Sequence, residues 1–255
     1  MKSISELKSD ALSSLSENWG VSVGACLVFF IINLALGLVP FIGSLVQLIL
    51  TGALSVGFSH FFLKISKSEK SDIEDLFVAF KTKDKFLASF SAYLLLIIII
   101  ITIILIFGSI WVSLFIGDLN NAWDFLIQGV TDSSLGANYQ IDPSLLDQGS
   151  SPIFQSGAGT ILVSSIILIF LPVTIVSLGL SQVFFLIADE KTNSGLEAIK
   201  MSWKIMYEKK GKLFLVQLSF IGWIILSVLT LFIGFIFLYP YMYTTLTKFY
   251  QSLYD

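Results

Sequence analysis

The sequence contains no arginine, one histidine and one cysteine, and only 13% of its 255 residues are charged. Soluble domains have about 25% charged residues, so this chain has too little polar surface to cover a water-facing exterior. The single cysteine, Cys26, excludes an internal disulfide, and a single histidine, His60, excludes a Cys/His metal cluster. Without arginine forks, a dedicated anion-clamping site is disfavoured. The net charge of −3 gives no reason to expect nucleic acid as a partner.

Hydrophobic residues make up 55% of the chain and gather into long runs. A helix needs about 20 apolar residues to cross the hydrocarbon core of a bilayer. The runs therefore predict an all-α fold, a polytopic transmembrane helix bundle of about six spans. The predicted spans are 20–39, 41–65, 86–116, 158–188, 213–228 and 235–249.

The last two spans depend on how residues 211–250 fold. This stretch forms either one long helix or a two-helix hairpin. We favour a hairpin broken near Leu231–Gly234, because glycine is common at helix ends. Pro240 then lies inside the second helix as a local kink.

The distribution of lysine predicts the orientation. Lysines precede the first span, lie between spans two and three and between spans four and five, and recur at Lys248. Segment 118–157 contains aspartates and no lysine. The positive-inside rule then places both termini in the cytoplasm and segment 118–157 on the extracytoplasmic side. This insertion is either a small folded cap or a disordered tether.

Three short amphipathic segments, 3–18, 71–81 and 194–208, precede the odd-numbered spans. Each starts with a capping-box pattern, Ser followed three residues later by Glu, and each has one apolar stripe. We expect these segments to lie in the membrane surface. They divide the single membrane domain, 1–255, into units 1–66, 71–188 and 194–255. Internal repeats are common in transporters, although insertion of helical hairpins produces the same pattern.

The sequence offers no catalytic chemistry. The span interiors contain essentially no charged residue, and no HExxH, GxSxG or P-loop pattern occurs. We therefore expect no enzyme activity, no catalytic residue, no metal and no cofactor. Uncharged or weakly basic polar residues remain within the spans, and they form either a polar path or ordinary interhelical hydrogen bonds. They are Asn33, Gln47, His60, Gln182 and Gln217.

Small residues at a spacing of four suggest where helices pack closely. Gly20 and Gly24 begin the first span, and Ala53 and Gly57 lie in the second. Such pairs let helix backbones approach, although the spacing is also common by chance.

Several sequence stretches carry a resemblance to a known family. They are 184–189, 195–202, 212–214, 218–223, 239–241 and 249–250, with 18–20, 52–54, 61–64 and 74–77 in the N-terminal unit. The chain resembles the bacterial integral-membrane family known as domain of unknown function 975. It departs from that family's pattern in the acidic insertion and between Tyr207 and Lys212.

The resemblance implies a six-span protein of the bacterial cytoplasmic (inner) membrane, and it brings no reaction or substrate. The residues of the family pattern have a structural interpretation: Trp19, Asp189, Gly222, Trp223, Tyr239, Pro240 and Tyr241. Gly222 and Trp223 would put a large ring beside a site of close helix approach. Tyr239 and Tyr241 would lie where their hydroxyls find partners.

Two functional hypotheses follow. The first is a non-enzymatic membrane accessory or scaffold protein, which binds a partner within or beside the lipid bilayer, either another membrane protein or a second copy in a homo-oligomer. The alternative is a transporter or lipid-handling protein, which moves a small uncharged or amphipathic substrate through a path between helix repeats.

Overall fold

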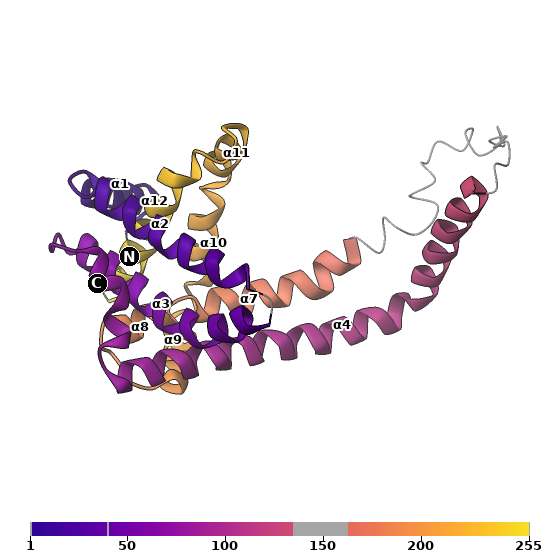
Figure 1. Ribbon diagram of the computed structural model, residues 1–255, viewed down its shortest axis with the longest axis horizontal. Helices are drawn as coiled ribbons and strands as arrows, with labels where there is room; N and C mark the ends of the chain where they lie inside the picture. Colours follow the sequence, from indigo (N-terminus) through magenta and orange to yellow (C-terminus); the bar gives the residue numbers. More distant parts are fainter. Residues whose placement is uncertain (1, 40, 135–162, 255) are drawn as a thin grey trace. The chain divides into compact units, whose positions relative to one another are not determined.

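The computed structural model describes residues 2–39, 41–134 and 163–254, and within them it is entirely helical (Figure 1). The all-α prediction is therefore confirmed.

The chain divides into two compact units, one made of Met1–Ile98 and Ser177–Asp255 and the other of Ile99–Val176. The helices of the N-terminal part are α1 (Ile4–Leu15), α2 (Trp19–Gly37), α3 (Ile42–Ser66), η1 (Ile73–Phe80) and α4 (Lys83–Ser134). Those that follow residue 162 are η3 (Ile166–Phe170), α7 (Leu171–Leu180), α8 (Val183–Ala188), α9 (Gly195–Ile205), α10 (Lys210–Leu218), α11 (Ile221–Leu229) and α12 (Phe235–Gln251).

Five helical stretches are long and apolar enough to cross a membrane. They are Trp19–Gly37, Ile42–Ser66, Lys83–Leu114, Val163–Ala188 and Lys210–Leu229. The predicted multi-span membrane protein is thus confirmed. The sixth predicted span corresponds to α12, which has only 17 residues. Because α11 ends at Leu229 and α12 begins at Phe235, the final stretch is a hairpin and not one long helix.

The third predicted span is part of a much longer helix. Helix α4 has 52 residues and continues to Ser134, so residues 118–134 of the predicted insertion are helical. The remainder of that insertion, 135–157, lies outside the described residues, and so does the choice between a cap and a tether there.

The fourth predicted span is interrupted twice. The π-helical turn η3, Ile166–Phe170, ends two residues before Pro172, and both π-turns and proline are common causes of helix kinks. A second break at Ser181–Gln182 separates α7 from α8. The Ser202 hydroxyl of α9 stabilises this break, because it donates to the Gly179 carbonyl at 2.8 Å and accepts from the Gln182 N–H at 3.2 Å.

Helix α1 begins with the predicted capping box. The Ser3 backbone N–H donates to Glu6 Oε2 at 2.6 Å, and the Glu6 N–H donates to Ser3 Oγ at 3.2 Å. Its apolar residues Leu7, Ala11 and Leu15 are fully buried, and α1 packs against α12. The stripe that the sequence predicts on this helix is therefore covered by protein.

The other two predicted capping boxes are wrong. At η1 the capping box is formed by Asp72 and Asp75 and not by Ser71. The Ser71 hydroxyl donates to the Asp75 carboxylate at 2.9 Å. At α9 Ser194 makes no capping hydrogen bond, because Glu197 accepts a hydrogen bond of 2.6 Å from the Thr192 hydroxyl. Local polar neighbours compete for the same carboxylates in both places.

Glycine allows three close backbone contacts in the first unit. A Cβ at Gly57 of α3 would lie 1.7 Å from the Leu76 carbonyl oxygen of η1. One at Gly52 would lie 2.4 Å from the Ser89 oxygen of α4, and one at Gly195 would lie 2.4 Å from the Ala92 nitrogen. The pair Gly20 and Gly24 marks no such contact, since only Ile73 Cδ1, 3.6 Å from a Cβ at Gly24, comes near either residue.

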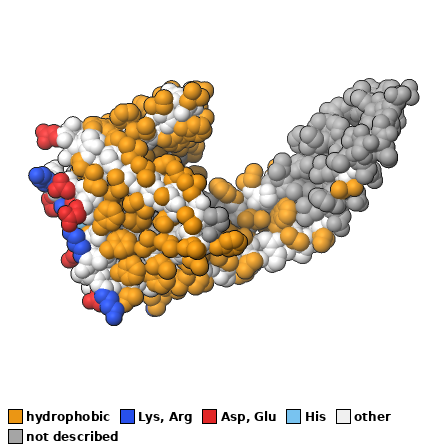
Figure 2. All heavy atoms as spheres, in the orientation of Figure 1, with side chains coloured by type: hydrophobic (Ala, Val, Ile, Leu, Met, Phe, Trp, Pro, Cys, Tyr) orange, Lys and Arg blue, Asp and Glu red, His pale blue; other side chains and the backbone are white. Residues whose placement is uncertain are grey.

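The core of the first unit is aromatic. Phe58 of α3 contacts Phe29, Phe62 and Tyr243, with ring centroids between 4.5 and 4.9 Å apart. The Tyr243 hydroxyl lies 2.9 Å from Ser59 Oγ, so its polar end is paired inside the core. Figure 2 shows the charged side chains of this unit gathered at one end, with hydrophobic side chains over the rest of the visible face. We call this end the charged end; its residues include Lys64, Lys67, Asp75, Asp189 and Glu190.

Candidate functional site

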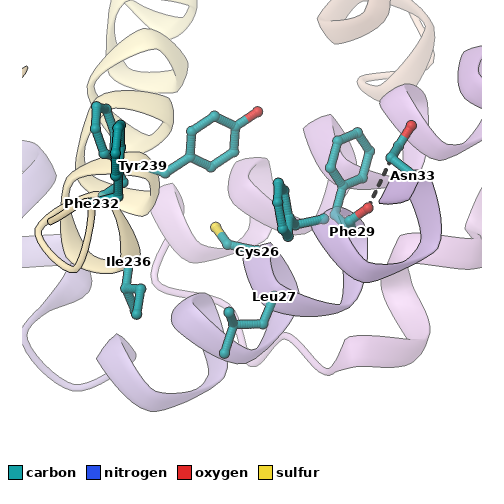
Figure 3. A pocket seen from close by; sticks show the side chains of 9 residues that line it. Cys26, Leu27, Phe29, Asn33, Phe232, Ile236 and Tyr239 are labelled. Atoms are coloured by element: carbon teal, nitrogen blue, oxygen red, sulfur yellow. Dashed lines mark hydrogen bonds between the residues drawn. The ribbon is translucent and has the colours of Figure 1, made fainter. Parts of the chain in front are cut away.

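An apolar groove lies between α2 and the beginning of α12. Its cavity volume is about 690 Å³, and none of its lining residues is charged. Figure 3 shows the side chains of the two helices facing each other across it. The lining residues are Cys26, Leu27, Phe29, Phe30 and Asn33 of α2, and Phe232, Phe235, Ile236 and Tyr239 of the final hairpin.

The shape of the hairpin turn puts its aromatic residues into the groove wall. Leu231 and Phe232 have φ angles of 52° and 68°, in the left-handed region that most side chains disfavour. The chain therefore reverses sharply, and the Phe232 ring stacks beside the Phe235 ring at 6.0 Å. Gly234 is required here, since a Cβ on it would lie 2.7 Å from Ser227 Oγ.

Two polar side chains provide the polar groups of the groove. Asn33 Nδ2 donates to the Phe29 carbonyl at 2.8 Å, the bond dashed in Figure 3. An asparagine amide has a second N–H and an acceptor oxygen, and these are not used by that bond. The Tyr239 ring packs on Phe58 at 5.9 Å, and no hydrogen bond joins its hydroxyl to the described residues. The groove therefore combines a large apolar surface with a few uncharged polar atoms.

A second polar cluster joins three helix ends at the charged end. Asp189, which follows α8, accepts from Lys67 at 3.0 Å and from the Tyr250 hydroxyl at 3.2 Å. Lys191 lies 3.7 Å from the same carboxylate. Lys248 donates to the Ser66 carbonyl at 2.5 Å. Lysines near helix C-termini offset the negative end of the helix dipole, so this cluster holds the ends of α3, α8 and α12 together.

Asp75 forms the other strong polar contact of this end. Burial alone would raise the pKa of its carboxyl, but hydrogen bonds from Lys64 at 2.7 Å, from the Asp72 N–H and from Ser71 outweigh burial. The net result is a pKa below the usual value for aspartate. Asp75 is therefore a carboxylate that holds η1 against the end of α3.

The five polar residues predicted from the sequence lie in separate places. Asn33 lines the groove, and Gln217 is exposed on α10. His60 Nδ1 lies 3.4 Å from the Ala188 carbonyl. Gln47 is half-buried on α3, and Gln182 is buried at the α7–α8 break, with its Oε1 unpartnered among the described residues. No hydrogen bond joins any two of the five side chains within the described part of the chain.

A protein-family model described as a protein of unknown function, DUF975, matches the chain over residues 1–255. The chain belongs to the DUF975 family. The resemblance inferred from the sequence is thus confirmed. Comparisons with curated proteins and with solved structures find no match.

Most residues of the family pattern have structural contacts. Asp189 is the centre of the charged-end cluster. Tyr241 packs edge-on against Phe220, with centroids 5.2 Å apart, and Trp19 packs against Phe237 at 6.2 Å. Pro240 lies inside α12, and its carbonyl accepts from the Thr244 hydroxyl at 2.7 Å.

Gly222 and Trp223 differ from the prediction. No atom lies within 4 Å of a Cβ built at Gly222, and Trp223 is 53% exposed. The predicted close helix approach at Gly222 and Trp223 is therefore wrong, because α11 turns this face outward.

The hairpin residues of the groove were missed by sequence reasoning. Phe232, Phe235 and Ile236 belong to a continuous apolar run, which shows no periodicity that separates groove residues from lipid-facing ones. The available signal was the turn itself, which has glycine at Gly234 and no charged residue.

Proposed function

We propose that this DUF975 protein is a non-enzymatic membrane protein that binds a hydrophobic partner inside the bilayer, and that the groove between α2 and α12 is its binding site. The observation that carries this proposal is the groove lining, which is apolar apart from Asn33, Tyr239 and the Cys26 thiol. An apolar site beside the spans is reached from the lipid phase and not from water. The proposal thus keeps the non-enzymatic role expected from the sequence.

A membrane lipid fits the groove best. Its volume, about 690 Å³, falls within the range of about 300–1,000 Å³ that small-ligand sites have. An acyl or isoprenoid chain would cover Leu27, Phe30 and Ile236. Asn33 and Tyr239 would bond an uncharged carbonyl or hydroxyl group, because an unpaired polar atom in hydrocarbon is costly.

Transport through the centre of the bundle is less well supported. The space between α2, α3, α8 and α12 is filled by the rings of Phe29, Phe58, Phe62, Phe185 and Tyr243. The five polar residues that would form a path are not bonded to one another in the described residues. Of the two forms of the transporter or lipid-handling hypothesis, we therefore favour lipid handling at the lateral groove over transport along a central path.

The test fills the groove with a larger side chain. Ile236→Trp places an indole in the groove, and Ile225→Trp on α11 is the matched control, since Ile225 is 56% exposed and does not line the groove. Proteins purified in mild detergent are compared by native mass spectrometry and lipid extraction. We expect wild type and Ile225→Trp to retain bound lipid and Ile236→Trp to lose it. Equal lipid content in all three would contradict the proposal.

A scaffold for another membrane protein is the second candidate. It is favoured by the α2–α3 turn, where Leu38, Phe41 and Ile42 are 74%, 86% and 68% exposed. Cross-linking in native membranes followed by affinity purification tests it. A stoichiometric partner that is lost on Phe41→Ser, but kept on Ile236→Trp, would assign the scaffold role to this turn.

The orientation belongs to the same proposal. The lysine-rich charged end contains both the α3–η1 turn and the α8–α9 turn, in agreement with the positive-inside rule. We place this end, with both termini, in the cytoplasm of a bacterial cell whose cytoplasmic membrane holds the spans.

A further inference from the structure

The final hairpin, α10–α11–α12, has a turn made almost wholly of apolar residues. From Leu229 to Phe237 the only polar side chain is that of Thr230. Leu229, Leu231, Phe232 and Ile233 are 74%, 82%, 66% and 62% exposed. Turns that face water are usually built from Gly, Asn, Asp, Ser and Pro, and here leucine and phenylalanine take the positive φ angles.

The turn also satisfies its own backbone. Every backbone N–H from Thr230 to Leu238 donates a hydrogen bond within the hairpin. The Thr230 hydroxyl donates to the Ser227 carbonyl at 3.0 Å and accepts from the Gly234 N–H at 3.1 Å. Irregular backbone is tolerated at hydrocarbon depth only where its polar groups are paired internally. This turn meets that condition without water.

The second arm of the hairpin, α12, is shorter than a full span, and it limits how deep the turn can reach. Lys248 is bonded to Ser66 at the charged end, and the rise from Lys248 back to Gly234 is at most about 21 Å. The other arm is the stretch Lys210–Leu229, which is long enough to cross by itself but ends in the same turn. The hydrocarbon core is about 30 Å thick. In contrast, α3 provides up to about 33 Å between Lys64 and Ile42, more than the thickness of the core.

We propose that the final hairpin is re-entrant: it enters the bilayer from the charged end, turns inside the hydrocarbon, and returns to the same side. Lipid acyl chains then cover the exposed apolar surface of the turn, which is formed by Leu229, Leu231, Phe232 and Ile233. The α2–α12 groove shares Phe232 with this turn. This inference stands on the hairpin alone and does not depend on occupancy of the groove.

Depth measurements on single-cysteine variants test the proposal. Cys26 is the only cysteine, so Cys26→Ala gives a background for Phe232→Cys at the turn and Ser68→Cys in the α3–η1 turn as the control. Each is labelled with a bimane fluorophore and reconstituted into vesicles whose lipids carry bromine at defined chain depths. We expect bromines deep in the chains to quench the label at 232 most strongly, and the label at 68 to be quenched little.

Access from water gives the second readout. A membrane-impermeant maleimide is added to unlabelled vesicles, before and after permeabilisation that opens both sides. We expect Ser68→Cys to react and Phe232→Cys to stay protected until the vesicles are dissolved. Reaction at 232 in permeabilised vesicles, or a bimane label at 232 that is quenched no more than the one at 68, would overturn the re-entrant hairpin. Leu231→Cys repeats both measurements in case one substitution prevents folding.

Discussion

The hydroxyl of Tyr250 donates a hydrogen bond of 3.2 Å to Oδ2 of Asp189, and so joins the end of α12 to the turn after α8. Tyr250 is buried and stacks on Phe185 at 5.3 Å. Lys67 at the end of α3 bonds the other carboxylate oxygen at 3.0 Å. Three segments far apart in the sequence are thus held at one carboxylate, which gives Asp189 a structural role.

Asp189→Asn removes this charge and keeps the shape of the side chain. We expect it to lower the free energy of unfolding by about 1.5–3 kcal/mol, since hydrogen bonds to charged groups contribute in that range. Tyr250→Phe removes a single donor and should cost about 1 kcal/mol. Denaturant unfolding in detergent micelles measures both, and the double variant shows whether the two losses are coupled. An Asp189→Asn protein as stable as wild type would mean that the cluster contributes nothing.

Close contact between α3 and η1 gives a prediction with an internal control. Gly57→Ala would place a Cβ 1.7 Å from the Leu76 carbonyl oxygen, so η1 must move. We expect a loss of about 1–3 kcal/mol, as for other overpacked sites. Gly222→Ala meets no atom within 4 Å and should be neutral or stabilising by about 0.5–1 kcal/mol, because alanine favours helix. In a thermal unfolding experiment, the unfolding temperature of Gly57→Ala should therefore fall. That of Gly222→Ala should stay unchanged or rise.

Protonation of Asp75 makes the same contact sensitive to pH. Its pKa is lower in the folded protein than in the unfolded chain, so the folded state holds the proton less tightly. The resulting stability is present above the unfolded pKa, about 3.9, and is lost as the pH falls through the lower folded pKa. Unfolding temperatures measured from pH 6 downward should fall across this window. Asp75→Asn should be less stable at pH 6 and should show a smaller fall. Parallel curves for both proteins would exclude Asp75 as the cause.

The sequence predicts the elements that depend on local patterns. Apolar runs locate the spans, Gly234 marks the hairpin turn, and Ser3 with Glu6 forms the predicted capping box. Prediction from the sequence fails where distant or competing contacts determine the structure. Ser71 bonds Asp75 and leaves the box to Asp72, and Gly222 faces outward although Gly57 is tightly packed. The groove also depends on how α2 meets α12, which no local pattern encodes. The sequence predicts Asn33 as a polar residue within a span, but it does not predict which residues lie next to Asn33 in the groove.

A lysine at the hairpin turn separates a re-entrant hairpin from one that crosses. Leu231→Lys would put a charge in hydrocarbon, where an ammonium costs about 2.5–3.5 kcal/mol near the bilayer centre. Leu38→Lys is the matched control, because Leu38 is 74% exposed at the turn of the longer hairpin, and a lysine there reaches the interface with its flexible stem. We expect the first variant to show a large loss of stability in reconstituted bilayers and the second a small one. Similar small losses would indicate that both turns lie at the membrane surface, in which case α12 crosses fully despite its length.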